Sequence, residues 1–133
     1  MYRIFRAVGK FREHVTRFFA TQIIIGVGKL HELNITHRDL KLENFMVDTD
    51  GYLQIIDFGL AGIIPQDKLS TTTCGTKEYF APEIVQKKGY DRRVDWWAVG
   101  ILIYEMLYGN TPFFSPNEHR CKVKILKEQP IFS

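Results

Sequence analysis

Residues 37–59 read HRDLKLENFMVDTDGYLQIIDFG, and this stretch decides how the chain folds. Two short runs rich in apolar, aromatic and β-branched residues, 45–47 and 52–56, flank the turn-forming residues DTDG at 48–51, and this pattern predicts a β-hairpin. Asn44 directly precedes the first run, and Asp57 directly follows the second. Because a hairpin returns the chain to its starting point, we expect Asn44 and Asp57 to converge on one cation.

Helices are predicted on both sides of this hairpin. Apolar residues at roughly helical spacing predict a long helix over residues 13–33. Gly26 and Gly28 weaken that helix by about 1 kcal/mol each relative to Ala, and we expect them to mark close packing of another backbone. Residues 95–108 are apolar on nearly every face, which is typical of a helix buried at the centre of a domain, and Gly109 is well placed to end it.

The remaining segments predict a loop and one more helix. Residues 62–76 show no periodicity and read as a long exposed loop, which in compact domains usually serves a function. Ser115 is expected to cap a following helix, Glu118 to complete its capping box, and Val123 and Leu126 to face inward. The predicted fold class is therefore mainly α with a small β-hairpin, in a single domain.

Composition limits the possible functions. The 133 residues are 45% hydrophobic and 25% charged, which is typical of a globular domain. A net charge of +3 is too small to indicate a nucleic-acid or membrane partner, and the longest apolar run, 96–107, contains Glu105 and is too short to span a bilayer. Two distant cysteines favour a reducing compartment, so we expect a cytoplasmic, or alternatively nuclear, protein.

The residue types around the hairpin indicate phosphoryl-transfer chemistry. Mg²⁺ takes oxygen ligands, usually only one or two of them from protein, and Asn44 with Asp57 meets that need. Lys41 can neutralise charge on a transferring phosphoryl group, while Asp39 can orient a substrate hydroxyl and accept its proton. Taken singly, Asp39, Asn44 and Asp57 could also be ordinary turn residues, because Asp and Asn favour turns.

Order and spacing of the motifs decide between these interpretations. The chain contains, in this order, HRDLKLEN at 37–44, DFG at 57–59, APE at 81–83 and DWWAVG at 95–100. This set resembles the signature of eukaryotic protein kinases. Residues 72–76, TTCGT, and 111–114, TPFF, resemble the AGC group of Ser/Thr kinases.

The resemblance covers essentially the whole chain and implies the C-terminal lobe of the protein-kinase-like α+β fold, without the N-terminal lobe that clamps ATP. Residues 1–133 would then form a partial kinase domain. Its parts would be a catalytic loop at 37–44, a magnesium-binding Asp-Phe-Gly at 57–59, an activation segment at 57–83 and a central helix at about 95–109.

The resemblance also implies site residues and ligands. The catalytic set would be Asp39 as base, Lys41 on the γ-phosphate and Thr76 linking the loop to both. ATP and Mg²⁺ are the implied cofactors. Their site would comprise Glu43, Asn44, Met46 and Asp57, with Asn44 and Asp57 as metal ligands and Met46 beneath the adenine.

Substrate choice and regulation are implied in the same way. Glu43, Glu78 and Glu105 match positions that bind Arg upstream of the target hydroxyl, which predicts protein substrates with Ser or Thr near basic residues. Arg38 beside the catalytic Asp suggests pairing with a phosphate on the loop. Thr72 is the expected acceptor for an upstream activating kinase, ahead of the alternatives Thr71 and Thr73.

Two departures from the family pattern bear on function. The Gly-rich loop and the strand Lys of kinases are absent from the sequence, so the chain alone is expected to be inactive. A non-catalytic docking or regulatory module is the alternative to an ATP-dependent Ser/Thr kinase. Lys77 stands where AGC kinases usually have Pro, which puts their apolar preference for the residue after the target hydroxyl in doubt.

Overall fold

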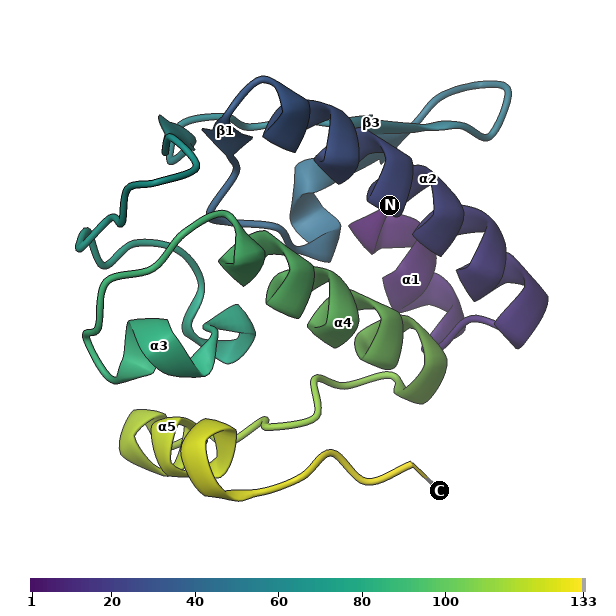
Figure 1. Cartoon of the computed structure of the whole chain (residues 1–133). Helices are drawn as coiled ribbons and strands as arrows, with labels where there is room; N and C mark the ends of the chain where they lie inside the picture. Colours follow the sequence, from purple (N-terminus) through teal and green to yellow (C-terminus); the bar gives the residue numbers. More distant parts are fainter. Residues whose placement is uncertain (133) are drawn as a thin grey trace.

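The computed structural model describes residues 1–132, and these form a mostly helical unit in which two long helices, α2 and α4, lie side by side (Figure 1). The α-helices are α1 Tyr2–Val8, α2 Glu13–Glu32, α3 Pro82–Val85, α4 Arg93–Tyr108 and α5 Glu118–Lys127. The 3₁₀ helices and strands are η1 Leu42–Asn44, η2 Lys77–Tyr79, β1 Ile35–Thr36, β2 Phe45–Val47, β3 Leu53–Ile55 and β4 Gly62–Ile63. Within this described part, no helix combines the length and apolarity that a membrane span requires.

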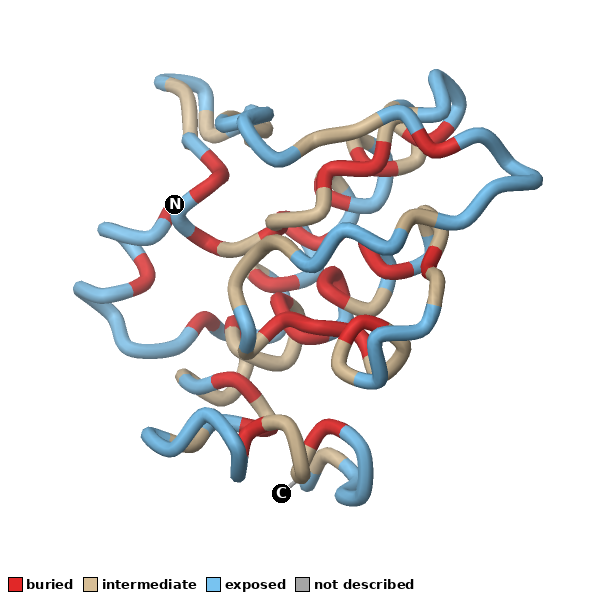
Figure 2. The backbone as a smooth tube through the Cα atoms, turned by 90° about the vertical axis from the view of Figure 1, so that its left-hand side faces the viewer, coloured by how far each residue is buried: buried red, intermediate tan, exposed pale blue. Residues whose placement is uncertain are grey.

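The core lies between α2 and α4. Val27 of α2 and Leu102 and Met106 of α4 have no exposed surface, and Figure 2 shows the buried segments running through the middle of the molecule. The prediction of a central helix is confirmed, because α4 is apolar around most of its circumference. Gly109 ends it in the left-handed conformation, with φ 89°.

The predicted hairpin is confirmed. Strands β2 and β3 pair antiparallel with Phe45 opposite Ile55, and the side chain of Asp48 closes the turn by accepting the N–H groups of Asp50 and Tyr52. Phe45 is 1% exposed and fixes the hairpin to the core.

The glycines of α2 behave differently from the prediction. A Cβ on Gly26 would lie 3.0 Å from Cδ1 of Ile55, so Gly26 admits a side chain of β3 and not another backbone. Gly28 faces open space, and the prediction of close backbone packing is wrong at both positions.

A second antiparallel pair was not predicted. β1 pairs with β4, with Ile35 opposite Ile63 and Thr36 opposite Gly62, so the segment interpreted as a loop begins in a small sheet. Two-residue strands carry no period that a sequence can display, since an alternating pattern needs about four residues.

The start and inner face of α5 differ from the prediction. Asn117, not Ser115, is the N-cap, because its Oδ1 accepts the N–H of Arg120 at 3.0 Å. The buried residues are Cys121 and Ile125, whereas Val123 is only partly buried and Leu126 is exposed. The shift arises because α5 begins two residues later than a cap at Ser115 would imply. Glu118 makes no capping contact and instead pairs with two lysines.

Candidate active site

Four predicted site residues form one hydrogen-bonded cluster. Thr76 Oγ1 donates to Asp39 Oδ1 at 2.7 Å, and Lys41 Nζ donates to Thr76 Oγ1 at 3.0 Å. Lys41 Nζ also lies 3.2 Å from Asp39 Oδ2. From the other side, Asn44 Nδ2 donates to the carbonyl of Asp39 at 2.8 Å and to its Oδ2 at 3.3 Å. The Asp39 carboxylate is thereby held in one orientation by three side chains.

The backbone of the Asp39 loop is anchored in the core by Asp95. Asp95 Oδ2 accepts the N–H of His37 at 2.8 Å, and Oδ1 accepts the N–H of Arg38 at 2.9 Å. His31 Nε2 lies 2.9 Å from Oδ2, and Asp95 itself is 1% exposed. Because its oxygens have three partners, this buried carboxylate is well satisfied and fixes the loop to the first turn of α4.

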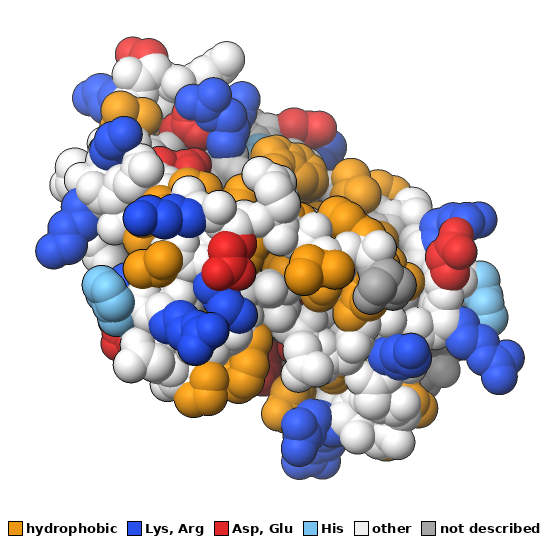
Figure 3. Space-filling model, turned by 90° about the horizontal axis from the view of Figure 1, so that it is seen from below, with side chains coloured by type: hydrophobic (Ala, Val, Ile, Leu, Met, Phe, Trp, Pro, Cys, Tyr) orange, Lys and Arg blue, Asp and Glu red, His pale blue; other side chains and the backbone are white. Residues whose placement is uncertain are grey.

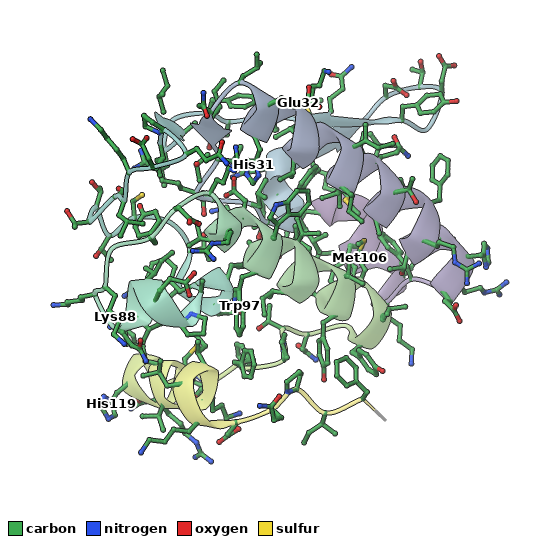
Figure 4. The ribbon with its side chains drawn as sticks, viewed as in Figure 1. His31, Glu32, Lys88, Trp97, Met106 and His119 are labelled. Carbon is green, nitrogen blue, oxygen red and sulfur yellow. The ribbon has the colours of Figure 1, made fainter. Side chains whose placement is uncertain are left out.

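His31 is the functional neighbour that sequence reasoning did not single out. It is buried, bonded to Asp95, and packed edge-on to Trp96 with the ring centroids 5.3 Å apart. Figure 4 shows His31 where the end of α2 meets the start of α4. No local motif indicates this contact, because His31 and Asp95 are 64 residues apart.

The loop after Asp57 closes over the cluster through a glycine. Gly75 has φ 104°, and a Cβ there would lie 2.5 Å from the carbonyl oxygen of Arg38. No other residue permits this approach of one backbone to another, so Gly75 sets the position of Thr76 beside Asp39.

Asn44 and Asp57 lie at the same end of the hairpin. The N–H of Ile56 donates to the carbonyl of Asn44 at 2.9 Å, and Asp57 follows Ile56 directly. Asp57 has φ 60°, its Oδ1 accepts the N–H of Gly59 at 3.1 Å, and the residue is exposed. Asn44 uses its Nδ2 within the cluster, and no described residue donates to its Oδ1. One amide oxygen and one carboxylate fit the small protein contribution that Mg²⁺ takes.

Met46, predicted to lie beneath the adenine, belongs to a different part of the surface. It is 54% exposed on β2 and lines a hollow of about 420 Å³ together with Glu43 and residues of α1. An exposed apolar side chain on this edge of the hairpin is compatible with a stacked base.

The three glutamates expected to bind basic substrate residues share one region. The Tyr79 hydroxyl donates to Glu105 Oε2, and Glu78 Oε2 accepts the hydroxyl of Thr111 at 2.9 Å. Burial raises the pKa of Glu105 to about 7, the bond from Tyr79 opposes that rise, and the charges of Glu43 and Glu78 add to it. The negative charges of Glu43 and Glu78 therefore act on Glu105, and a cation bound among the three carboxylates would reduce their mutual repulsion.

Arg38 and Thr72 are not in hydrogen-bond contact. Arg38 Nε donates to the carbonyl of Leu60 at 2.6 Å, whereas the carbonyl of Thr72 accepts the hydroxyl of Tyr90 at 2.6 Å. Among the described residues, the Arg38 guanidinium has no carboxylate partner and the side chain of Thr72 is exposed. The Arg38 guanidinium and the Thr72 hydroxyl therefore make no contact with each other in this structure.

A separate hollow lies away from this cluster. A groove of about 700 Å³ runs between α4, α5 and residues 128–132, with Trp97, Tyr104, Phe113 and Phe132 in its walls. Figure 3 shows the apolar side chains gathered on this lower face. Its walls are mostly apolar, with Lys127, Glu128 and Gln129 at one end, and they include none of the four residues that make up the cluster around Asp39.

A helical unit that fixes Asp39, Lys41 and Asn44 beside a hairpin ending in Asp-Phe-Gly has the architecture of the C-terminal lobe of a kinase-like fold. The protein kinase domain family matches residues 1–133, and the chain therefore belongs to the protein kinase family.

Individual relatives agree with this assignment. The chain is 48% identical over 121 residues to Serine/threonine-protein kinase AtPK1/AtPK6 of Arabidopsis thaliana, covering 91% of this chain and 26% of the relative. It is 46% identical over 124 residues to Serine/threonine-protein kinase Sgk2 of Homo sapiens, covering 92% of this chain and 33% of the relative. It is 45% identical over 126 residues to cAMP-dependent protein kinase catalytic subunit 3 of Drosophila melanogaster, covering 95% of this chain and 21% of the relative. The resemblance to AGC-type Ser/Thr kinases is thus confirmed, and the chain spans 21–33% of the length of these relatives.

Proposed function

We propose that this chain supplies the phosphoryl-transfer residues of a Ser/Thr protein kinase that moves the γ-phosphoryl group of ATP to protein hydroxyls. The observation that carries the proposal is the orientation of the Asp39 carboxylate by Thr76, Lys41 and Asn44, with Asp57 at the same end of the hairpin. Two of these contacts join separate segments, Thr76 with Asp39 across 37 residues and Ile56 with Asn44 across the hairpin, which turn chemistry alone does not require.

The geometry supports distinct roles within that reaction. The Asp39 carboxylate would orient the substrate hydroxyl and take its proton, and positioning contributes more than basicity in such transfers. Lys41, which bonds to Thr76 at 3.0 Å, would stabilise negative charge on the transferred group. Asn44 and Asp57 would hold Mg²⁺, which neutralises phosphate charge when bound.

Substrate preference and regulation extend the proposal. Glu43, Glu78 and Glu105 would bind Arg side chains upstream of the target hydroxyl. Burial and then the charges of Glu43 and Glu78 raise the pKa of Glu105, and a bound cation would stabilise its carboxylate against both. Phosphorylation of the exposed Thr72 by an upstream kinase would give the Arg38 guanidinium an anionic partner. Free thiols at Cys74 and Cys121 suit the proposed cytoplasmic or nuclear location.

A chimera tests the catalytic proposal. The chain replaces the segment of human Sgk2 that it matches over 124 residues, so that the missing kinase parts come from the relative. We expect this chimera to phosphorylate Ser peptides with upstream Arg and to lose the activity on Asp39→Asn. The 133-residue chain alone should show negligible transfer, because its sequence contains no Gly-rich phosphate loop.

The outcome separates the two classes of function. A folded chimera that binds ATP but transfers no phosphate would refute the proposal and leave a docking or regulatory module as the better explanation. Circular dichroism and thermal unfolding establish that the chimera and its Asp39→Asn variant are equally folded.

A further inference from the structure

The positive charge of the chain is concentrated at its start. Of the 18 Arg and Lys residues, four lie within residues 1–12, and none of the 15 Asp and Glu residues lies there. Without these four cations the net charge of +3 would be −1. Such an asymmetry is typical of proteins that contact polyanions or anionic membranes. The four cations are Arg3 and Arg6 of α1, and Lys10 and Arg12 of the turn that joins α1 to α2.

The protein does not neutralise these four cations. All four residues are exposed, and the ion pairs found among the described residues 1–132 are formed by other basic residues. Arg17, the next basic residue along the chain, is different, because it pairs with Glu13 at 2.6 Å. The positive field of residues 1–12 is therefore directed at the solvent.

The core holds this basic segment in a fixed shape. Phe5 of α1 is buried and packs edge-on against Phe11, with the ring centroids 5.6 Å apart. The N–H of Phe11 donates to the carbonyl of Met106 at 2.7 Å, which ties the turn after α1 to the end of α4. Figure 1 shows α1 beside the first half of α2, on the opposite side of the view from α3. A ligand would thus find the cations already in place.

Exposed apolar side chains accompany the cations. Ile4 and Val8 are 47% and 57% exposed, and a spacing of four residues places them on the same flank of α1. The phosphates of a nucleic acid offer no apolar partner to this pair. The surface of an anionic bilayer offers both kinds of contact, since its headgroups attract the cations and the boundary of its acyl chains receives aliphatic side chains.

We propose that α1 and residues 9–12 form a peripheral binding surface for membranes that contain anionic phospholipids. None of its residues belongs to the cluster around Asp39, so the surface acts independently of the proposed phosphoryl transfer. Two aliphatic side chains provide little apolar area, and the charges must therefore supply most of the binding. Near a phosphatidylserine-rich surface each basic residue strengthens binding about 5-fold.

The test is co-sedimentation of the 133-residue chain with phosphatidylcholine vesicles that contain about 30% phosphatidylserine or none, in about 0.1 M salt. Arg3→Gln/Arg6→Gln should lower the partition coefficient for the phosphatidylserine vesicles about 25-fold. Lys87→Gln/Lys88→Gln is the matched control, because it removes the same charge from two exposed lysines that follow α3, where Figure 4 labels Lys88. The control should change binding by less than about 2-fold, since screening confines the attraction to residues near the membrane.

A third variant separates a lipid surface from a general polyanion site. Ile4→Gln/Val8→Gln keeps every charge, so it should weaken vesicle binding and leave the affinity for a single-stranded oligonucleotide unchanged in fluorescence anisotropy. Circular dichroism checks that all variants are equally folded.

Three results would overturn the proposal. One is binding that does not depend on phosphatidylserine, and another is an equal loss of binding in the arginine and lysine variants. The third is vesicle binding that survives Ile4→Gln/Val8→Gln, which would identify a site for polyanions such as nucleic acid and not for a membrane.

Discussion

Replacing Asp95 by Ala should destabilise this chain more than any other single removal of a carboxylate. Asp95 is 1% exposed and has three partners: the backbone N–H groups of His37 and Arg38, and Nε2 of His31. Each buried donor left without an acceptor costs about 1–3 kcal/mol. Because the three losses share one small region and will not add fully, we expect about 3–5 kcal/mol, the range measured when one member of a buried polar pair is removed.

Asp91 provides a matched control at the same end of α4. Its carboxylate also accepts a backbone N–H, that of Arg93 at 2.8 Å, but its side chain is 21% exposed and water can replace it. Asp91→Ala should therefore cost about 1 kcal/mol, as is usual for a single hydrogen bond that water can replace. Asp95→Asn, which keeps one carbonyl acceptor, should lie between the two alanine variants.

Guanidinium unfolding of the 133-residue chain, followed by circular dichroism and Trp fluorescence, gives the free energies of unfolding. Hydrogen exchange at the amides of His37 and Arg38 reports the local effect, and both should exchange faster in Asp95→Ala even where the fold persists. A loss in Asp95→Ala equal to that in Asp91→Ala, with unchanged exchange at both amides, would show that the anchoring argument is wrong.

Three further predictions concern single sites. Burial raises the pKa of Glu105 from 4.5 to about 7, so the stability contributed by its protonated form is complete below pH 4.5 and is lost as pH rises through 7. Solvent screening limits this change in the free energy of unfolding to about 1 kcal/mol. Glu105→Gln should remove the pH dependence in unfolding measured from about pH 4 to 8. Gly75→Ala should displace the loop, because its Cβ would lie 2.5 Å from the Arg38 carbonyl, and limited proteolysis after residue 68 should accelerate. Asn117→Ala should cost about 1 kcal/mol in the same unfolding assay, whereas Ser115→Ala should cost less, since Asn117 is the cap.

Sequence patterns predicted the elements whose signal is long or chemically specific. The continuous apolar run of α4 and the turn residues between β2 and β3 each leave few alternative folds. The β1–β4 pair escaped prediction because two-residue strands have no period. The prediction of which residues of α5 face inward was wrong because Ser115 and Asn117 are both good N-caps. The packing of Cys121 and Ile125 against the core selects Asn117.

Some contacts of the candidate site could be predicted from the sequence pattern, some only from the family resemblance, and one not at all. Convergence of Asn44 and Asp57 follows from hairpin topology, and the structure places both at one end of it. The contact of Thr76 with Asp39 and Lys41 was expected only from the resemblance, since 37 residues separate Thr76 from Asp39. The bond between His31 and Asp95 could not be derived at all, because it depends on how α2 crosses the start of α4.

Asp95 and Thr76 hold the Asp39 loop in different ways. A change at one should affect folding, whereas a change at the other should affect activity. Asp95 acts from the core, with two buried hydrogen bonds and a third that is partly buried, so disturbing it must disturb the fold. Thr76 acts from the partly exposed segment that follows Asp57, and it contacts the carboxylate of Asp39 and not the backbone. Movement of that segment can therefore remove one of the three side-chain contacts that orient the carboxylate, while Lys41, Asn44 and the loop stay in place. A change at Thr72 or Lys77, on either side of Thr76, can reach the proposed base through this single hydroxyl without unfolding the helices beneath it.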